Sequence, residues 1–592
     1  MAENFRNKKS VKMKNRIKLF AAVVTAFLVS SFFVSCGETE EASYETIEGG
    51  VKRGGIYRIN ELEDIRSLDP VRIGDVVSHH VAHQLYDGLV DLDSNLQLVP
   101  QLATSWEISE DGLLYTFHLR KGVKFHDNKC FPDGKGREFT AQDVKYSYDR
   151  ICDPRTQSTG YNYFKNYVEG AAEYYESLTG GKDGGPASEK GVSGFIVKDD
   201  STFQIKITKP FGPFIYYSTL AYGYIVAREA VEMYGQDYFQ NPVGTGPFAF
   251  VDWKPDLELN MARNPNYWEK DQHGNQLPYL DGAKFRFIKD LAAQQLEFTN
   301  GVLDESYRIP NETFRDVVGE DGNLTPGYSQ FVLQKAPTLS IQYYGFLTSG
   351  TVFNNKILRQ ALNYAVDKEK VVKFVVNGQA FGPAVHGIVP PSMPDYPTDQ
   401  IKGYEYNPEK AKQLLTEAGF PGGQGLPPIK LQINSGGDRN LQVAEAIQAM
   451  LKNVGINMEL ELIPFAQHLD NIDAGRANMW RLGWVADYPD PENFLNLYYG
   501  KNVPNDPTQI SPINSTRYVN PEFDRLFEQA IATTDKTERY KLYAQAEQIA
   551  VDDAPMMYIY YDQDFRLVQP YVRGYVLDPM HRVNFRYLWL DK

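Results

Sequence analysis

The first half of the chain alternates apolar and polar positions in a pattern that predicts β-hairpins. Residues 106–108 and 113–119 carry an apolar side chain at every second position on either side of an Asp-Gly pair. This alternation is typical of strands with one face against a core, and Asp-Gly favours the tight turns of hairpins. Segments 195–197 and 203–207 repeat the pattern. Between the two predicted hairpins we expect a helix over 140–150, whose first residue is an N-capping threonine.

In the second half, strand-like and helix-like patterns alternate. Residues 429–433 alternate, 443–454 keep apolar residues at helical spacing up to a glycine, and 456–462 alternate again. A strand–helix–strand order predicts an α/β domain whose sheet is at least partly parallel. Further helices are expected over 355–366, over 410–418 and from Asn520-Pro521 onward.

The N-terminus has the features of an export signal. Seven lysine or arginine residues lie between positions 6 and 18, and an apolar run follows over 19–34. That run is shorter than the roughly 20 residues that cross a bilayer, so we interpret 1–35 as a signal peptide. The Ser-Cys pair at its end, Ser35-Cys36, resembles the lipobox of bacterial lipoproteins, in which the cysteine, here Cys36, is acylated after cleavage. Residues 36–53 are then expected to form a flexible tether.

Length and charge limit the class of protein. A chain of 592 residues is too long for one hydrophobic core, so two or three domains are expected. A formal net charge of −15 argues against nucleic acid and anionic membrane surfaces as partners. Aromatic residues make up 13% of the chain, which suits a ligand-contacting cleft and a large aromatic core equally well.

Cysteines and histidines leave two questions open. Cys130 and Cys152 could form a disulfide in an oxidising compartment, but their spacing does not fix the distance between their Cα atoms. His79 and His83 are spaced to share one helical face and could share a metal. No nearby carboxylate or cysteine completes a set of ligands, so solvent-facing histidines are the simpler interpretation. We expect no metal and no cofactor.

Several segments, in the same order along nearly the whole chain, carry a family resemblance. They lie at 85–89, 102–107, 111–112, 115–120, 122–127, 139–144, 242–247, 263–268, 359–367 and 484–491. Together they resemble the peptide/nickel-binding class of ABC transporter solute-binding proteins, which includes the oligopeptide- and dipeptide-binding lipoproteins. The resemblance implies an α/β, two-lobed periplasmic-binding-protein fold of the cluster C type, with an extra subdomain inserted in the first lobe. It places a discontinuous domain I at 54–98, 235–335 and 561–592, domain II at 99–234 and domain III at 336–560.

The resemblance also implies where a ligand binds. In oligopeptide-binding members, an Arg, a Trp and an Asp stand at the positions of Arg481, Trp484 and Asp487, and the Asp pairs with the α-ammonium of the peptide. Asp87 belongs to an element that lies near the cleft in this family. Each residue also has a purely structural interpretation: a turn for Asp487, a core aromatic for Trp484, an ion pair for Arg481 and a turn cap for Asp87.

The function expected from these features is transport and not catalysis. We predict an extracytoplasmic, membrane-anchored lipoprotein that captures a small peptide or peptide-like ligand in a closing cleft. It would act as a monomer and deliver the ligand to an ABC permease and ATPase complex. The alternatives are a non-peptide solute, such as a nickel chelate, haem, an opine or an oligosaccharide, and a secreted hydrolase. The sequence has neither the His-Glu-x-x-His nor the Gly-x-Ser-x-Gly motif that would favour a hydrolase.

Overall fold

The computed structural model describes residues 44–179, 191–350, 352–435 and 438–592. Residues 46–592 form one compact unit, and the description concerns that unit. The predicted signal peptide and Cys36 lie outside the described residues. Among the described residues, no helix is both long enough and apolar enough to cross a membrane.

The two predicted hairpins join in one antiparallel sheet. Strands β6 (Ala103–Ile108) and β7 (Leu114–Leu119) form the first hairpin, and β8 (Phe195–Asp199) and β9 (Thr202–Lys206) the second; the strand order is β6-β7-β9-β8. Helix α3 (Ala141–Ile151) begins at the predicted cap, with a reciprocal capping box between Thr140 and Asp143. The apolar positions of β7 are buried, whereas Ile108 on the edge strand β6 stays exposed, because β6 has a neighbour on one side only.

A second four-stranded sheet has the order β10-β11-β12-β3. It contains β3 (Ile56–Glu61), β10 (Phe248–Lys254), β11 (Glu258–Arg263) and β12 (Gly282–Phe287). Strand β3 is parallel to β12 although the two lie far apart in the chain, so this sheet joins distant segments.

The largest sheet has seven strands and the order β13-β19-β14-β18-β16-β17, with β15 (Ala380–Pro383) paired to β19. The other bounds are β13 (Glu305–Tyr307), β14 (Val332–Phe346), β16 (Ile429–Asn434), β17 (Met458–Ile463), β18 (Met479–Val485) and β19 (Met556–Val568). Strands β16 and β17 are parallel and are joined through helix α12 (Asp438–Asn453). The predicted strand–helix–strand unit is therefore confirmed.

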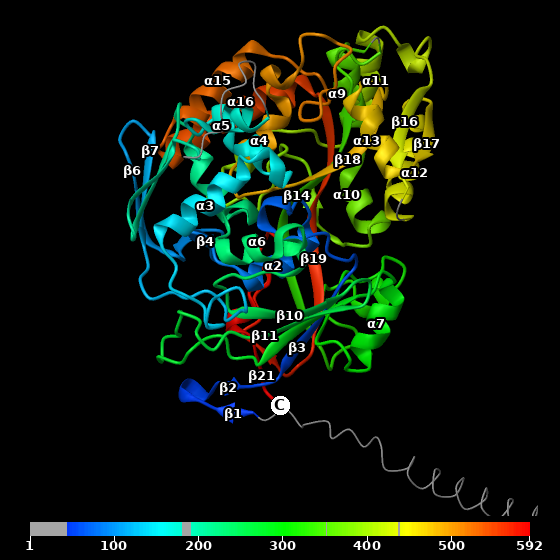
Figure 1. Cartoon of the computed structure of the whole chain (residues 1–592). Coiled ribbons are helices and arrows are strands. Elements are labelled where there is room, and N and C mark those ends of the chain that lie inside the picture. The colour runs from blue at the N-terminus through cyan, green and yellow to red at the C-terminus, as the bar shows by residue number, and fades with distance from the viewer. Residues whose placement is uncertain (1–43, 180–190, 351, 436–437) are drawn as a thin grey trace, which may run out of the picture. The chain divides into compact units, whose positions relative to one another are not determined.

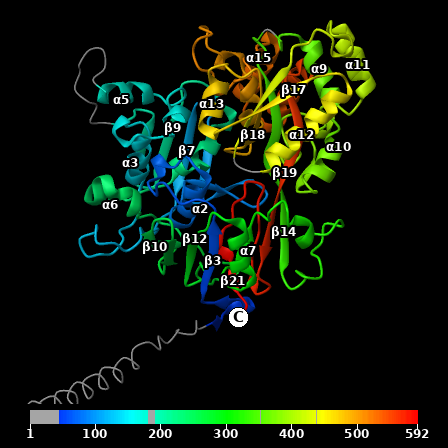
Figure 2. The ribbon, with the colours of Figure 1, turned by 90° about the vertical axis from the view of Figure 1, so that its right-hand side faces the viewer.

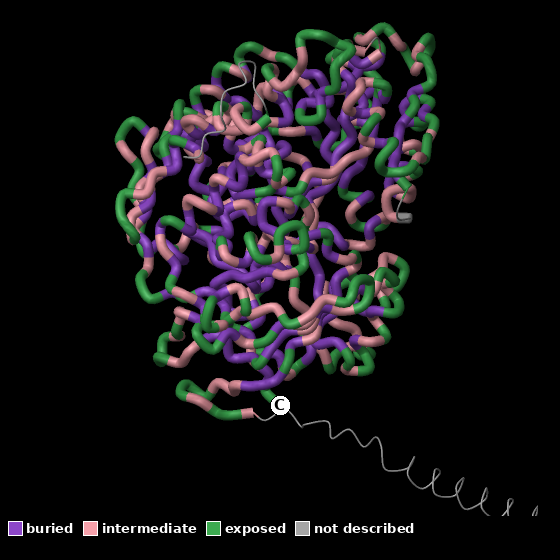
Figure 3. Tube along the Cα trace, in the orientation of Figure 1, coloured by how far each residue is buried: buried purple, intermediate pink, exposed green. Residues whose placement is uncertain are grey.

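Strands β14 and β19 are long and lie side by side in antiparallel pairing, as Figures 1 and 2 show. Successive residues of β14 enter different cores. Tyr343 belongs to one buried cluster, with Tyr540, and Tyr344 belongs to another, with Leu431 and Ile447. This follows from the two-residue period of a strand, which sends adjacent side chains to opposite faces. Buried residues fill the interior of the unit, and exposed residues follow its outer loops and helix faces (Figure 3).

The remaining elements cover these sheets and connect them. The helices are α2 (Val76–Leu85), α4 (Tyr161–Phe164), α5 (Ala171–Leu178), α6 (Arg228–Tyr234), α7 (Leu291–Thr299), α8 (Phe314–Val317), α9 (Lys356–Ala365), α10 (Lys368–Lys370), α11 (Pro408–Glu417), α13 (Phe465–Asp473), α14 (Glu492–Leu495), α15 (Pro521–Ala532) and α16 (Lys536–Asp553). The short strands are β1 (Glu45–Thr46), β2 (Lys52–Arg53), β4 (Val90–Leu92), β5 (Leu98–Pro100), β20 (Val572–Arg573) and β21 (Trp589–Leu590). Helices α9, α11 and α15 begin at asparagine caps, of which Asn520 at α15 is the one that the sequence analysis predicts.

Two expectations about local structure are revised. Ile47 and Val51, within the expected tether 36–53, pack against a cluster that contains Tyr267, so the folded part begins before residue 54. Cys130 and Cys152 are free thiols, so the possible disulfide between them is not formed. Cys152 is buried at the C-terminal end of α3, where burial raises the pKa of its thiol.

Candidate functional site

A cavity of about 470 Å³ lies where the large sheet meets the segment that follows β13. Strands β14, β18 and β19 and helix α12 contribute to its wall, and so do residues 307–312, which begin at the last residue of β13. Its charged lining residues are Arg308, Glu312, Arg439, Arg481, Asp562, Asp564 and His581. We refer to it as the cleft cavity. A space lined by both cations and carboxylates suits a polar ligand with charged ends.

Arg481 lies on β18 and lines the cleft cavity. Its guanidinium donates to Asn434 Oδ1 at 3.2 Å and to Gln342 Oε1. It forms no ion pair with Asp487 or with any other carboxylate of the described residues. Arg481 and Trp484 differ by an odd number of residues and therefore face opposite sides of β18.

Asp487 lies two residues beyond the end of β18. Its Oδ2 accepts hydrogen bonds at 3.2 Å from Tyr163 OH and at 3.2 Å from Asn493 Nδ2. Water still reaches the residue, yet protein surrounds it closely enough that desolvation raises the pKa of its carboxyl, against the two hydrogen bonds that lower it. This combination describes a carboxylate that is open to solvent on one side and held by two neutral donors on the other.

Asn493 connects Asp487 with Trp484. Asn493 Oδ1 accepts from Trp484 Nε1 at 3.0 Å and from the backbone N–H of Asp487 at 3.1 Å. The Trp484 ring is partly buried and packs against a core cluster. One side of the Trp484 ring therefore contributes to the core. The side-chain amide of Asn493, which also contacts Asp487, fixes the position of the ring.

Three carboxyl groups lie close together in this turn, and they differ in charge. Asp490 is buried and pairs with the buried Arg539 at 3.2 Å. Desolvation raises the pKa of Glu492 to about 8, so this carboxyl is mostly protonated at neutral pH. Asp487 differs from Asp490, because no cation of the described residues forms an ion pair with it. It is the carboxylate of this turn that lacks a positive partner.

Aromatic rings surround the turn. Tyr163 contacts Tyr217 and Tyr222 with ring centroids 5.1 and 5.6 Å apart, and Tyr488 contacts Tyr217 at 5.5 Å. Rings of this kind provide apolar walls and attract cations at their faces. The surroundings of Asp487 are thus suited to a positively charged group.

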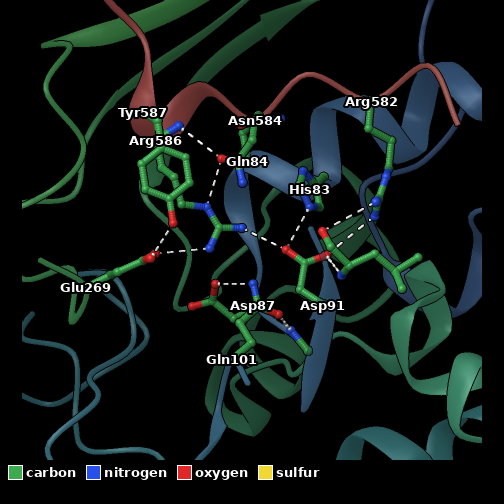
Figure 4. A network of polar contacts seen from close by, with 12 residues as sticks. His83, Gln84, Asp87, Asp91, Gln101, Glu269, Arg582, Asn584, Arg586 and Tyr587 are labelled. Carbon is green, nitrogen blue, oxygen red and sulfur yellow. Dashed lines mark hydrogen bonds and ion pairs between the residues drawn. The ribbon is translucent and has the colours of Figure 1, made fainter. Parts of the chain in front are cut away.

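Asp87 occupies a different environment, shown in Figure 4. It is 0% exposed, and its carboxylate accepts from Gln101 Nε2 at 2.8 Å, Thr245 Oγ1 at 2.9 Å and Trp268 Nε1 at 3.1 Å. With these donors in place, no part of the carboxylate faces solvent. In this conformation Asp87 holds together segments that are distant in sequence. This favours a structural role for Asp87 over direct contact with a ligand.

The histidines of α2 do not form a common site. His79 Nε2 pairs with Tyr224 OH at 2.9 Å, and His83 Nε2 lies 3.4 Å from Asp91 Oδ2. The expectation that they face solvent is wrong for His83, which is buried. Burial lowers the pKa of His79 well below its ordinary value.

The structure adds residues that the sequence did not single out. Tyr163 reaches Asp487 across 324 positions of sequence, and Arg308 and Arg439 join Arg481 at the cleft cavity. No local pattern marks these contacts. Asn493 is close to Asp487 in the sequence, only 6 residues after it. Asparagine is common in Pro-rich turns, however, so the sequence does not mark it as part of a site.

Comparison with known proteins gives consistent results. A sequence profile of the "Bacterial extracellular solute-binding proteins, family 5 Middle" matches residues 97–506. Heme-binding protein A of Haemophilus influenzae is 32% identical over 531 residues, which cover 86% of this chain and 88% of the relative. The periplasmic oligopeptide-binding protein OppA of Salmonella typhimurium is 30% identical over 545 residues, covering 90% and 92%.

Solved structures agree with these relatives. The periplasmic binding protein DppA from Helicobacter pylori, in complex with the peptide STSA, is 29% identical and superposes with a TM-score of 0.69 over 91% of this chain and 98% of that chain. The HbpA2 structure from Haemophilus parasuis has 25% identity and a TM-score of 0.73, over 90% and 100%. The fold is thus the α/β two-lobed fold of the periplasmic binding proteins. The chain is a solute-binding protein and not an enzyme, and it belongs to the bacterial extracellular solute-binding proteins of family 5.

Proposed function

We propose that this protein captures peptides outside the cytoplasm and that Asp487 binds the α-ammonium of the peptide. The observation that carries the proposal is the state of Asp487, a solvent-reachable carboxylate without a cationic partner among the described residues, next to the aromatic residue Tyr163. An ammonium leaving water requires an opposite charge, and a carboxylate provides a charge-assisted hydrogen bond. Trp484, held by Asn493, forms part of the wall beside it.

Names of the relatives support a peptide as the cargo. The similar proteins include the dipeptide-binding protein of Escherichia coli and oligopeptide-binding proteins, and the DppA structure contains a bound peptide. Delivery to an ABC permease and its ATPase follows from the same likeness, since DppA is described as associated with an ABC transporter.

The mechanism that fits the geometry is closure around the ligand. Tyr163 and Asp487 come from segments far apart in the chain, and the long strands β14 and β19 connect the parts that line the cleft cavity. A peptide that contacts both sides stabilises the closed arrangement by its difference in affinity for the two states. The carboxyl end of the peptide would lie toward Arg481, which has a guanidinium at the cavity wall.

Calorimetry with short peptides tests the ammonium site. Asp487→Asn should weaken binding of free peptides about tenfold or more, which is the scale for loss of a buried charge partner. N-acetylation of the peptide should weaken its binding to the wild type by a similar factor. It should leave the affinity of the variant almost unchanged, because both changes remove the same contact.

The variant should fold normally. Since desolvation raises the pKa of Asp487, its charge costs stability at pH values above that pKa, and the neutral Asn should not lower the melting temperature at pH 7. Equal affinity of the wild type for acetylated and free peptides would show that Asp487 does not bind an ammonium.

A second candidate cargo is haem, favoured by one observation, the 32% identity to a heme-binding protein. Haem absorbs strongly in visible light, so titration of the purified protein with haem distinguishes the two cargoes. Haem binding that short peptides fail to displace would favour this candidate over the peptide.

We propose further that the protein is held at the membrane as a monomeric lipoprotein, acylated at Cys36. Two acyl chains on one residue are sufficient for stable anchoring, whereas a single chain binds only reversibly. The support is the Ser-Cys pair directly after the signal-like segment.

A further inference from the structure

Arg308 stands out among the residues of the cleft cavity. It lines the cavity from the segment after β13, whereas Arg439 and Arg481 line it from α12 and β18. The side chain of Arg308 is exposed, and its guanidinium lies 5.0 Å from the centre of the Tyr307 ring. Arg308 therefore lines the same space as Arg481, but it follows β13, which β19 and β14 separate from β18 in the sheet.

The acidic groups around Arg308 already have partners. Asp564 pairs with Arg566 and with His581, each at 3.1 Å. Asp562 accepts from Ser340 Oγ at 2.8 Å and from Gln342 Nε2 at 2.7 Å, with Arg439 at 3.8 Å. Arg308 itself forms no ion pair within the described ranges of the chain, and Glu312, the remaining carboxylate of the lining, is exposed. The Arg308 guanidinium is thus left without a carboxylate partner at the cavity wall, with the Tyr307 hydroxyl as a neutral hydrogen-bond partner.

The backbone of Arg308 is also unusual. Its φ is +59°, in the left-handed region that residues other than glycine rarely adopt. Such a conformation costs free energy and persists where the surrounding structure holds it, often at ligand sites. In this case the conformation belongs to the residue whose guanidinium lines the cavity.

We infer that Arg308 is a specificity-determining residue that binds a carboxylate of the cargo in the cleft cavity, together with Arg481. The inference rests on the proposed peptide-binding function and extends it to the class of peptide. A guanidinium matches the geometry of a carboxylate with two parallel hydrogen bonds, which an amide cannot accept equally well. The carboxylate is either the C-terminus of the peptide or the side chain of an acidic residue.

The experiment compares alanine peptides of two to six residues as free acids and as C-terminal amides, by calorimetry on the mature protein. Arg308→Gln should weaken binding of the free acids about tenfold and change binding of the amides by less than about twofold. Arg525→Gln, which removes an exposed arginine of α15 that pairs with Glu522, is the matched control and should change neither. Peptide amides that carry one internal glutamate distinguish the two sources of the carboxylate. They regain affinity only if the carboxylate of a side chain can bind in place of the C-terminus.

Several outcomes separate the possible failures. If peptides bind and Arg308→Gln weakens acids and amides equally, or weakens neither, the role of Arg308 is refuted and the proposed function stands. If no peptide binds to the wild type, the proposed function fails and this inference fails with it. Arg308→Asn guards against misfolding, since asparagine tolerates the left-handed backbone; it should keep the melting temperature and lose affinity for the free acids as Arg308→Gln does.

Discussion

At the scale of single residues, the charge of Asp487 depends on neighbours that have no charge themselves. Desolvation raises the pKa of Asp487, while Asn493 and Tyr163 lower it by donating hydrogen bonds to the ionised form. The same Asn493 holds Trp484. One amide thus controls both the protonation of the proposed ammonium partner and the position of the adjacent ring.

Removal of that amide should change the pH dependence of binding. An ammonium ligand requires the ionised carboxylate, so affinity is lost as the pH falls through the pKa of Asp487. In Asn493→Ala that pKa rises, and the loss of affinity should begin at a higher pH than in the wild type. At pH 7 the variant should bind peptides several-fold to about tenfold more weakly, the scale for a hydrogen bond to a charged group.

Peptide titrations between about pH 4 and 8 measure this shift, in the range where a perturbed carboxyl titrates. Asn457→Ala, at an exposed position between α12 and β17, is the control and should leave the profile unchanged. If Asn493→Ala lost its affinity for the peptide at the same pH as the wild type, Asn493 would not influence the pKa of Asp487.

At the scale of elements, buried charges attach the C-terminal segment to β4. Asp91 on β4 contacts Arg586 at 2.9 Å and Arg582 at 3.4 Å, and His83 lies 3.4 Å away (Figure 4). Burial alone would raise the pKa of Asp91, but His83 and the two arginines outweigh it and hold the pKa well below its ordinary value. The network joins residues that are 495 positions apart.

Asp91→Asn should therefore lower the free energy of unfolding by about 1–3 kcal/mol at pH 7, because Arg582 and Arg586 lose the buried carboxylate that they share and keep only Asp578 and Glu269 as partners. A carboxyl whose pKa is lowered by folding stabilises the protein above its unfolded pKa of about 4 and loses this contribution at lower pH. The difference between the variant and the wild type should accordingly shrink in acid.

Denaturant unfolding at pH 7 and at about pH 3 measures both effects, since these values lie on either side of the unfolded pKa. Asp399→Asn, an exposed residue of the 3-10 helix Thr398–Gln400, serves as the control. A variant of Asp91 as stable as this control at pH 7 would contradict the network's role.

At the scale of the whole molecule, the proposals concern location and closure. If Cys36 carries the lipid, Cys36→Ser should move the protein from the membrane fraction to the soluble extracytoplasmic fraction, because the acyl chains provide the affinity for the bilayer. Peptide binding by the purified protein should be unchanged. Fractionation of cells that express either form measures the distribution, and retention of Cys36→Ser at the membrane would argue for another means of attachment.

The sequence predicted local structure well, because hydrophobic period and capping act over a few residues. The hairpins of β6 to β9, the β16–α12–β17 unit and the N-caps Thr140 of α3 and Asn520 of α15 are all found. The family and the fold followed from ordered segments along the chain. The domain boundaries and the roles of Arg481, Trp484 and Asp487 in ligand binding stay predictions.

Tertiary structure alone decided which of these residues meet. The sequence placed Arg481, Trp484 and Asp487 within one short stretch, but the two-residue period of β18 turns Arg481 to the cleft cavity and Trp484 to the core. Asp87 carries the same carboxylate as Asp487, yet burial among protein donors gives it a structural place. By itself the sequence determined the elements, the family and the candidate residues; which side chains are charged, free and facing the cleft depended on contacts between segments far apart in the chain, which no local pattern encodes.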